Sequence, residues 1–163
     1  MFCIGDKVVH PMHGAGIIDG IVSERMGGVT QEYYVFKMPV GGLVLKIPTA
    51  NSAAVGLRAT VAAGDAARLL RELPALAVEM NSNWNHRYRE NLQRLKSGDL
   101  YEVARVIKGL LHRENQKGLS TGERKMLHTA KQILISEMVL VTGRDYRAIE
   151  DRIQAAVSEE MAG

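Results

Sequence analysis

The single tryptophan of the chain, Trp84, lies in a polar and basic segment that runs from Asn81 to Arg89, and no other apolar residue lies within three positions of it. In the first turn of a helix, a side chain leans toward the N-terminus, where no preceding turn covers it. Helical spacing would then place Arg87, Asn91 and Arg94 along one edge of the tryptophan. Arginines and helix N-terminal amides bind phosphates, and an indole can stack on bases or wedge between them. The segment indicates an exposed tryptophan on a nucleic-acid-binding surface.

A structural role for Trp84 is the alternative interpretation. Trp84, Tyr88, Leu92 and Leu95 follow the spacing of one helix face. The tryptophan could therefore begin an apolar stripe that packs against a core. Both interpretations stay open at this point.

Positive charge is concentrated around this segment. Residues 81–131 hold eleven Lys and Arg against five Asp and Glu, a balance of +6, whereas the whole chain carries +3, so the rest of the chain carries −3. A local basic field is the usual footprint of a surface that meets phosphates. The alternative is that these side chains only keep exposed helix faces in contact with water.

Other kinds of site are poorly matched by the sequence. Cys3, His10 and His13 could ligate a metal, but no second pair at ligand spacing follows them. Residues 14–16 begin like a dinucleotide-binding fingerprint without completing it, and residues 118–125 have the wrong spacing for a phosphate-binding loop. Neither a nucleophile with a paired base nor a nucleophile elbow is evident. We expect no enzyme activity, no cofactor and no metal.

Composition agrees with an ordinary globular protein. Hydrophobic residues make up 46% of the 163 residues and charged residues 24%. The lone cysteine, Cys3, fits a reducing compartment. No signal peptide is expected at the N-terminus, and the longest apolar run, Ile133 to Val141, is too short to cross a bilayer. These features predict a cytoplasmic protein that does not enter membranes.

The first third of the chain has the alternation and turn residues of short strands. Four runs stand out: Lys7 to His10, Ala15 to Arg25, Thr30 to Met38, and Leu43 to Ile47. So few short strands cannot build a sandwich. We therefore predict a small, strongly bent SH3-like or Tudor-like β-barrel over residues 1–55. The stretch that follows, residues 51–63, is rich in Ala and Val rather than polar and flexible.

From about Gly64 the apolar residues follow helical spacing. Pro74 breaks a first short helix, and the pair Ser97-Gly98 ends the next one. Asp99 and Ser120 each precede a Glu by three residues, a pattern that begins a helix. Thr142-Gly143 stops the helix that begins at Ser120, and a last helix is expected from about Asp145 to Met161. The fold class is therefore α+β, with a compact all-α bundle over residues 60–163 after the barrel.

Four stretches of the sequence form a recognisable combination: Ile4 to Gly16, Glu32 to Tyr34, Asn83 to Leu92, and Gly118 to Leu127. Together they resemble the CarD/CdnL family of bacterial transcription regulators. The resemblance covers nearly the whole chain in the right order. The first stretch alone would be less specific, because a similar module occurs in the transcription-repair coupling factor, a much larger ATPase.

The resemblance implies how the two halves would act. The Tudor-like domain would dock on the β subunit of RNA polymerase, and the helical domain would contact promoter DNA. Trp84 matches the tryptophan that engages the minor groove at the upstream edge of the melted bubble, where it opposes closure. Arg87 and Arg89 match basic residues that hold this tryptophan on the DNA backbone. No helix-turn-helix recognition pattern is evident, so binding should be largely independent of sequence.

The resemblance extends to further residues of both surfaces. Arg124 and Lys125, near a helix start, would contact phosphates. His86 stands where the family often has a more basic residue, so its contribution should weaken as the pH rises above the titration range of imidazole. On the barrel, Arg25 and Lys46 match positions used in docking. Family members often have Arg at the position of Lys46, and Lys lacks the bidentate geometry of Arg.

The competing interpretation is a protein-interaction adaptor. Its basic face would bind RNA polymerase or another acidic partner and would not touch DNA. In either case we expect the protein to act as a monomer.

Overall fold

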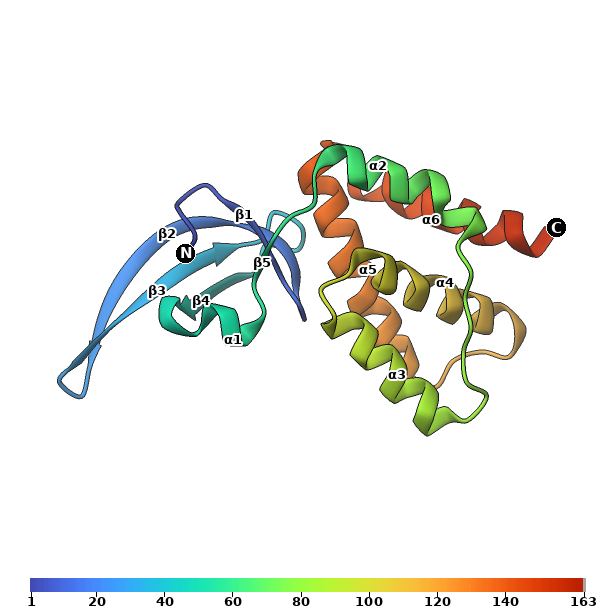
Figure 1. The fold of residues 1–163 in the computed structure, drawn as a ribbon, viewed down its shortest axis with the longest axis horizontal. Helices are drawn as coiled ribbons and strands as arrows, with labels where there is room; N and C mark the ends of the chain where they lie inside the picture. Colours follow the sequence, from blue (N-terminus) through green and yellow to red (C-terminus); the bar gives the residue numbers. More distant parts are fainter. Residues whose placement is uncertain (163) are drawn as a thin grey trace.

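Five strands near the N-terminus form one antiparallel sheet in the computed structural model, which describes residues 1–162 of the backbone and side chains as far as residue 158. The sheet order is β4-β3-β2-β1-β5. β4 and β5 therefore form the two ends of the sheet, and β2 and β3 form a long curved hairpin that points away from the helices (Figure 1). The strands are β1 (Lys7–His10), β2 (Gly14–Met26), β3 (Val29–Lys37), β4 (Val44–Pro48) and β5 (Arg58–Ala59).

Glycine makes the tight turn of the long hairpin possible. Met26 pairs with Val29, so only Gly27 and Gly28 connect β2 to β3. Both have positive φ angles, 58° and 82°, which a two-residue hairpin turn of this kind requires. A bulge between Ile18 and Gly20 shifts the register of the same pair of strands. Bulges increase the local twist, in agreement with the strong curvature of the hairpin.

The segment after β4 contains local structure that the sequence did not predict. It forms a short 3-10 turn, η1 (Thr49–Asn51), and a single helical turn, α1 (Ser52–Val55). Gly56, with a φ of 93°, reverses the chain into β5. β5 pairs with β1, so the sheet extends past residue 55, where the predicted barrel ended.

Helices and the connections between them form the rest of the described chain. Their bounds are α2 (Ala63–Glu72), the 3-10 turn η2 (Leu73–Ala75), α3 (Trp84–Lys96), α4 (Leu100–Gln116), α5 (Thr121–Thr142) and α6 (Tyr146–Ala162). The side chain of Asp99 caps α4 and that of Ser120 caps α5. Gly143, with a φ of 74°, ends α5. The predicted α+β class, a Tudor-like sheet followed by a helical domain, is confirmed. Gly163, the last residue of the predicted bundle, lies outside the described residues.

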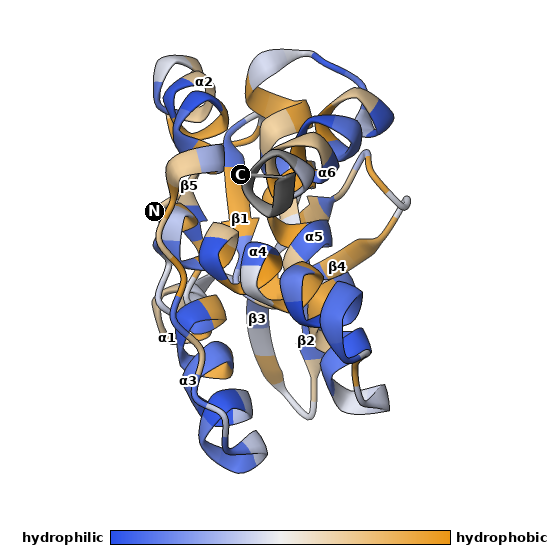
Figure 2. Cartoon of the chain, turned by 90° about the vertical axis from the view of Figure 1, so that its right-hand side faces the viewer, coloured by the Kyte–Doolittle hydropathy of each residue, from blue (hydrophilic) through white to orange (hydrophobic). Residues whose placement is uncertain are grey.

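Two clusters of buried apolar side chains hold the fold together. The smaller one lies inside the sheet and is built around Ile18, Tyr34 and Phe36. The larger one fills the space between the helices and also takes in Val9 and Ala15 of the sheet. In Figure 2 the orange segments of β1, α4 and α5 lie in the middle of the molecule, and blue segments lie around them. The sheet and the helices therefore share part of one core.

No helix within residues 1–162 combines the length and apolar character that crossing a membrane requires. Among the described side chains, His, Cys, Asp and Glu nowhere gather in a group of three or more that could hold a metal ion.

Candidate nucleic-acid interface

Trp84 is the first residue of α3, and the residue before it caps the helix. The side-chain oxygen of Asn83 accepts a hydrogen bond from the backbone N–H of His86 at 3.2 Å. Asparagine is among the best residues for this position. The indole of Trp84 is 42% exposed, the only aromatic side chain among the large exposed apolar residues of the described chain. The segment predicted to present the tryptophan therefore does so.

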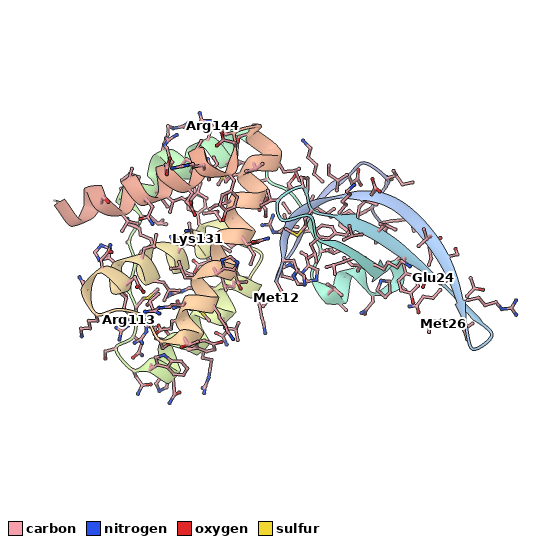
Figure 3. All side chains as sticks on the ribbon, turned by 180° about the vertical axis from the view of Figure 1, so that it is seen from behind. Met12, Glu24, Met26, Arg113, Lys131 and Arg144 are labelled. Atoms are coloured by element: carbon pink, nitrogen blue, oxygen red, sulfur yellow. The ribbon has the colours of Figure 1, made fainter. Side chains whose placement is uncertain are left out.

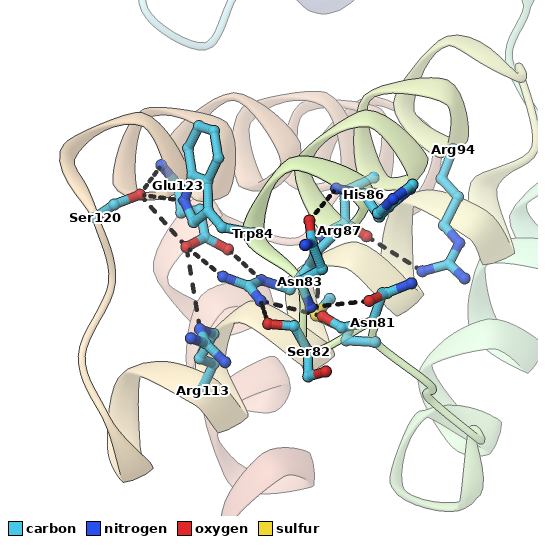
Figure 4. Close-up of polar contacts among 12 residues, drawn as sticks. Asn81, Ser82, Asn83, Trp84, His86, Arg87, Arg94, Arg113, Ser120 and Glu123 are labelled. Atoms are coloured by element: carbon cyan, nitrogen blue, oxygen red, sulfur yellow. Dashed lines mark hydrogen bonds and ion pairs between the residues drawn. The ribbon is translucent and has the colours of Figure 1, made fainter.

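The indole is exposed but held in place. One face stacks on the ring of Tyr88, with centroids 5.1 Å apart and planes 16° from parallel. The indole Nε1 donates a hydrogen bond to the Oγ of Ser120 at 3.0 Å (Figure 4). Gly122, in the first turn of α5, lies beside the ring, where a Cβ would make an ordinary contact at 3.7 Å. An indole fixed on one side and open on the other would lose little conformational freedom on binding a ligand.

The apolar stripe that begins at Trp84 also exists. Leu95 at its far end is buried, and Tyr88 and Leu92 are half-buried against the helical core. Trp84 is the solvent-exposed end of this stripe. The two interpretations of the sequence therefore describe different parts of one helix face.

Arg87 does not lie where a phosphate could reach it. Its side chain is 1% exposed, and its guanidinium donates to both carboxylate oxygens of Glu123, at 2.8 and 3.1 Å. The remaining nitrogen donates to the backbone oxygens of Asn81 and Ser82, each at 3.1 Å (Figure 4). The resemblance implied a direct backbone contact, but in this structure all three guanidinium nitrogens are bound within the protein. Arg87 instead ties the start of α3 to α5.

Glu123 is the buried partner that makes this arrangement possible. Its carboxylate lies in the first turn of α5 and is almost completely covered. The hydrogen bonds from Arg87 lower the pKa of Glu123 below its ordinary value, so the carboxylate is charged at neutral pH. Arg113 adds a further positive group, with its Nε 4.0 Å from the same carboxylate.

Ser120 connects this ion pair to the tryptophan. Its hydroxyl accepts the backbone N–H of Glu123 at 3.2 Å and the indole N–H of Trp84 at 3.0 Å. It also donates to the carboxylate of Glu123 at 3.3 Å. A hydroxyl has one donor and two acceptor positions, so all three are occupied. The capping residue of α5 therefore also sets the orientation of the indole.

The four other residues that the resemblance implied as DNA contacts are exposed. His86 and Arg89 lie on α3, and Arg124 and Lys125 lie in the first turn and a half of α5. None of the four side chains has an ion pair with another described residue. The bond from Trp84 to Ser120 brings the N-terminal ends of the two helices together. The start of α3 and the start of α5 therefore meet at the indole.

Several of the basic side chains counted between residues 81 and 131 are buried or ion-paired, so they add less to the surface charge than the count suggests. Lys108 is buried, and its amino group donates to the backbone oxygens of Leu73, Pro74 and Leu76 at 2.8 to 2.9 Å. It thus closes the end of a preceding helical segment. Arg94 and Arg105 both pair with Glu102, and Lys131 pairs with Glu150. Cations within protein ion pairs contribute less to an external field.

The two predicted docking residues are exposed on the sheet but are not brought together. Lys46 pairs with Glu24 across the sheet. Arg25 follows Glu24 in β2, and successive side chains of a strand point to opposite faces. Arg25 therefore leaves the face opposite to that of Lys46. Figure 3 shows Glu24 and Met26 near the tip of the hairpin, at the end of the molecule away from the helices.

Sequence reasoning missed the roles of Ser120 and Glu123. Both were recognised as a helix start, but nothing linked them to Trp84 and Arg87, which lie 36 residues earlier. A Ser and a Glu three residues apart are already explained by a capping box, so the sequence offered no further signal.

Comparisons with known proteins cover both halves of the chain. Residues 2–61 match the family model of the CarD-like/TRCF RID domain, and residues 68–154 match that of the CarD C-terminal domain. The chain is 32% identical over 143 residues to the Bacillus subtilis (strain 168) protein named "Putative transcription factor YdeB". The alignment spans 88% of this chain and 94% of that protein.

Proposed function

Because the chain belongs to the CarD family of transcription regulators, with an RNA polymerase interaction domain at its N-terminus, we propose that it stabilises the open promoter complex. In this proposal the sheet binds the β subunit of RNA polymerase. The helical domain contacts the minor groove at the upstream edge of the melted bubble. The protein performs no chemical reaction and acts in the cytoplasm, at promoters.

The observation that carries the proposal is the held but exposed indole of Trp84. Apolar side chains that enter the minor groove partly unstack a base step. A flat ring that lies at a helix start, with exposed cations on the same two helices, suits this use. Arg89, Arg124 and Lys125 would neutralise phosphates on either side of the inserted ring. His86, also exposed on α3, would add a further contact. Arg87 would act indirectly, by holding the start of α3 on α5.

The energy required is modest. A ligand shifts an equilibrium between two states by its difference in affinity for them. A wedge with a few phosphate contacts needs to favour the open state by only about 1 to 3 kcal/mol, which corresponds to about 5- to 150-fold. Attachment to the polymerase raises the effective concentration at the junction, so the DNA contact itself can be weak.

The test is the lifetime of the open complex with the wild-type protein and with Trp84→Ala. We expect the variant to shorten the lifetime to that seen without the protein, while binding to the polymerase persists. Trp84→Phe keeps a flat apolar ring but loses the bond to Ser120, and should lie between the two. A wild-type lifetime with Trp84→Ala would reject the wedge and favour the adaptor that binds polymerase without touching DNA.

Docking is tested on the sheet. Arg25→Glu and Lys46→Glu are made separately, because the two side chains leave opposite faces, and then together. We expect the double variant to lose co-purification with the β subunit, and the single variants to show which face carries the contact. Lys37→Glu, another exposed cation of the sheet, is the control. Undiminished binding by the double variant would refute the docking residues.

A further inference from the structure

The sheet and the helical domain are joined by directional bonds along one helix, α5. The Oγ of Ser136 accepts the backbone N–H of Ala15 at 2.8 Å, and both residues are buried. The fit is close, because a Cβ on Gly14 would lie 2.3 Å from the same Oγ. One turn further along α5, the amino group of Lys7 donates to the backbone oxygen of Leu140 at 3.3 Å.

The strongest of these contacts is made by Glu137, whose side chain is 0% exposed. Its two carboxylate oxygens accept hydrogen bonds from the guanidinium of Arg58 at 2.7 and 3.0 Å. One of them also accepts the backbone N–H of Val61 at 2.8 Å. Arg58 belongs to β5, the end strand of the sheet, and Glu137 belongs to the central helix of the other domain.

This geometry restricts rotation between the two domains. A bidentate arginine–carboxylate pair fixes both distance and orientation. The hydrogen bonds from the backbone N–H groups of Ala15 and Val61 to α5 constrain the orientation of the domains in two further directions. A buried carboxylate is tolerated only while its partners remain in place, so loss of Arg58 would favour exposure of Glu137 to water.

The same helix holds the tryptophan at its other end. Ser120, at the start of α5, binds the indole of Trp84, and Glu137 lies 17 residues further on. At 1.5 Å per residue this corresponds to about 25 Å of a continuous helix. α5 therefore connects the proposed docking sheet to the proposed DNA contact without a flexible joint.

We propose that Glu137 and Arg58 are positioning residues, which fix the sheet relative to Trp84 so that docking on the polymerase determines where the indole meets the DNA. This inference rests on the proposed function. It adds that the connection between the sheet and Trp84 is rigid and of fixed length rather than flexible. A rigid connection gives the indole a higher effective concentration at one place on the DNA than a flexible connection does.

The experiment has one readout of geometry and one of function. Residual dipolar couplings of the free protein report the relative orientation of the sheet and the helices. In the wild type, both should fit a single alignment tensor. In Arg58→Ala we expect two different tensors, while each domain keeps its own fold. Arg68→Ala is the control, because Arg68 makes an exposed ion pair on α2, away from the sheet.

The functional readout is the open-complex lifetime. Arg58→Ala should shorten it several-fold, although co-purification with polymerase and binding of the free protein to junction DNA remain at wild-type levels. If Arg58→Ala alone is too unstable, Arg58→Ala with Glu137→Gln removes both charges without leaving a buried carboxylate, and should give the same result.

Two outcomes would contradict the proposed rigid connection. One is a single alignment tensor for the sheet and the helices in these variants, and the other is two tensors together with a wild-type lifetime of the open complex. Failure of the proposed function looks different. In that case Trp84→Ala leaves the lifetime unchanged, and the dipolar couplings still show whether Arg58 and Glu137 fix the sheet.

Discussion

Arg87 and Arg89 lie two positions apart on α3 and have different surroundings. Arg87 is buried and each of its guanidinium nitrogens makes a hydrogen bond, whereas Arg89 is exposed and has no ion pair with a described residue. The family resemblance implied that both of them contact the DNA backbone. Because of their positions in the helix, Arg87 joins α3 to α5, whereas Arg89 can reach a ligand.

This difference predicts opposite consequences of the same substitution. Arg87→Ala leaves the buried carboxylate of Glu123 without its main partner, so the free energy of unfolding should fall by about 3 to 5 kcal/mol. Arg89→Ala should change it by about 0.5 kcal/mol or less and weaken DNA binding instead. Urea unfolding and a DNA-binding titration on both variants measure the two effects. Equal stability of the two variants would contradict the role given to Arg87.

Ser120 can be tested through the tryptophan itself. Ser120→Ala removes a helix cap, at a cost of about 1 kcal/mol, together with the acceptor of the indole N–H. Because Trp84 is the only tryptophan, the fluorescence emission of the protein reports its surroundings directly. We expect a shifted emission maximum for Ser120→Ala and an unshifted one for Thr121→Ala, its exposed neighbour. An unshifted spectrum for both variants would mean that Ser120 does not hold the ring.

His10 gives the sheet domain a dependence on pH. Burial, together with the nearby His13, lowers the pKa of His10 from 6.5 to about 4. The unfolded chain therefore takes up this proton at a higher pH than the folded one. The free energy of unfolding should fall as the pH decreases from 7 to 5.

His10→Asn keeps an acceptor for the backbone N–H of Met12, which His10 binds at 3.1 Å through Nδ1, and cannot be protonated in this range. Its stability should vary less between pH 7 and pH 5 than that of the wild type, as measured by urea unfolding at each pH. If the free energy of unfolding varied equally with pH in both proteins, His10 would be excluded as the cause of the pH dependence.

At the scale of the helices, local signals specify the boundaries. Asp99 accepts the backbone N–H of Tyr101 at 2.9 Å and begins α4, which packs on both α3 and α5. Three separate side chains begin the two helices of the candidate interface and the helix that packs on both: Asn83 for α3, Ser120 for α5 and Asp99 for α4. The arrangement of the interface thus depends on short-range capping as well as on the core.

The cap of α4 predicts a defined loss of stability. Asp99→Ala should lower the free energy of unfolding by about 1 kcal/mol, while Asp99→Asn, which also caps well, should leave it nearly unchanged. Urea unfolding of the three proteins measures the difference. A loss of the same size in Asp99→Asn would point to the charge of Asp99 rather than to its cap.

At the scale of the whole molecule, the charge that matters is the charge left unpaired on the surface. Buried Lys108 and the paired Arg94 and Arg105 should add little to DNA binding, whereas Arg124 and Lys125 should add directly. The affinity for DNA should fall as salt increases, because phosphate contacts release counterions.

Each phosphate contact contributes about 0.9 to the slope of log affinity against log salt concentration. Arg124→Ala and Lys125→Ala should each reduce the slope by about that amount, and Arg105→Ala should not. The slope is measured by fluorescence anisotropy of labelled junction DNA at several salt concentrations. An equal reduction with Arg105→Ala would mean that the whole basic face binds, not the cluster around Trp84.

The sequence by itself determined the fold class, most strand and helix limits, and the exposed start of α3. These follow from local physics: alternation, helical spacing, caps, and glycines at turns. The same local signals did not reveal β5, because two residues of a strand are too short to produce a pattern.

Only the tertiary structure separated Arg87 from Arg89, removed Lys108 from the basic face, and joined Trp84 to Ser120 and Arg58 to Glu137. The reason is distance along the chain. Ser120 lies 36 residues from Trp84, and Glu137 lies 79 residues from Arg58. A bond between such residues forms only when packing brings two elements together, and it leaves no periodic trace in either element.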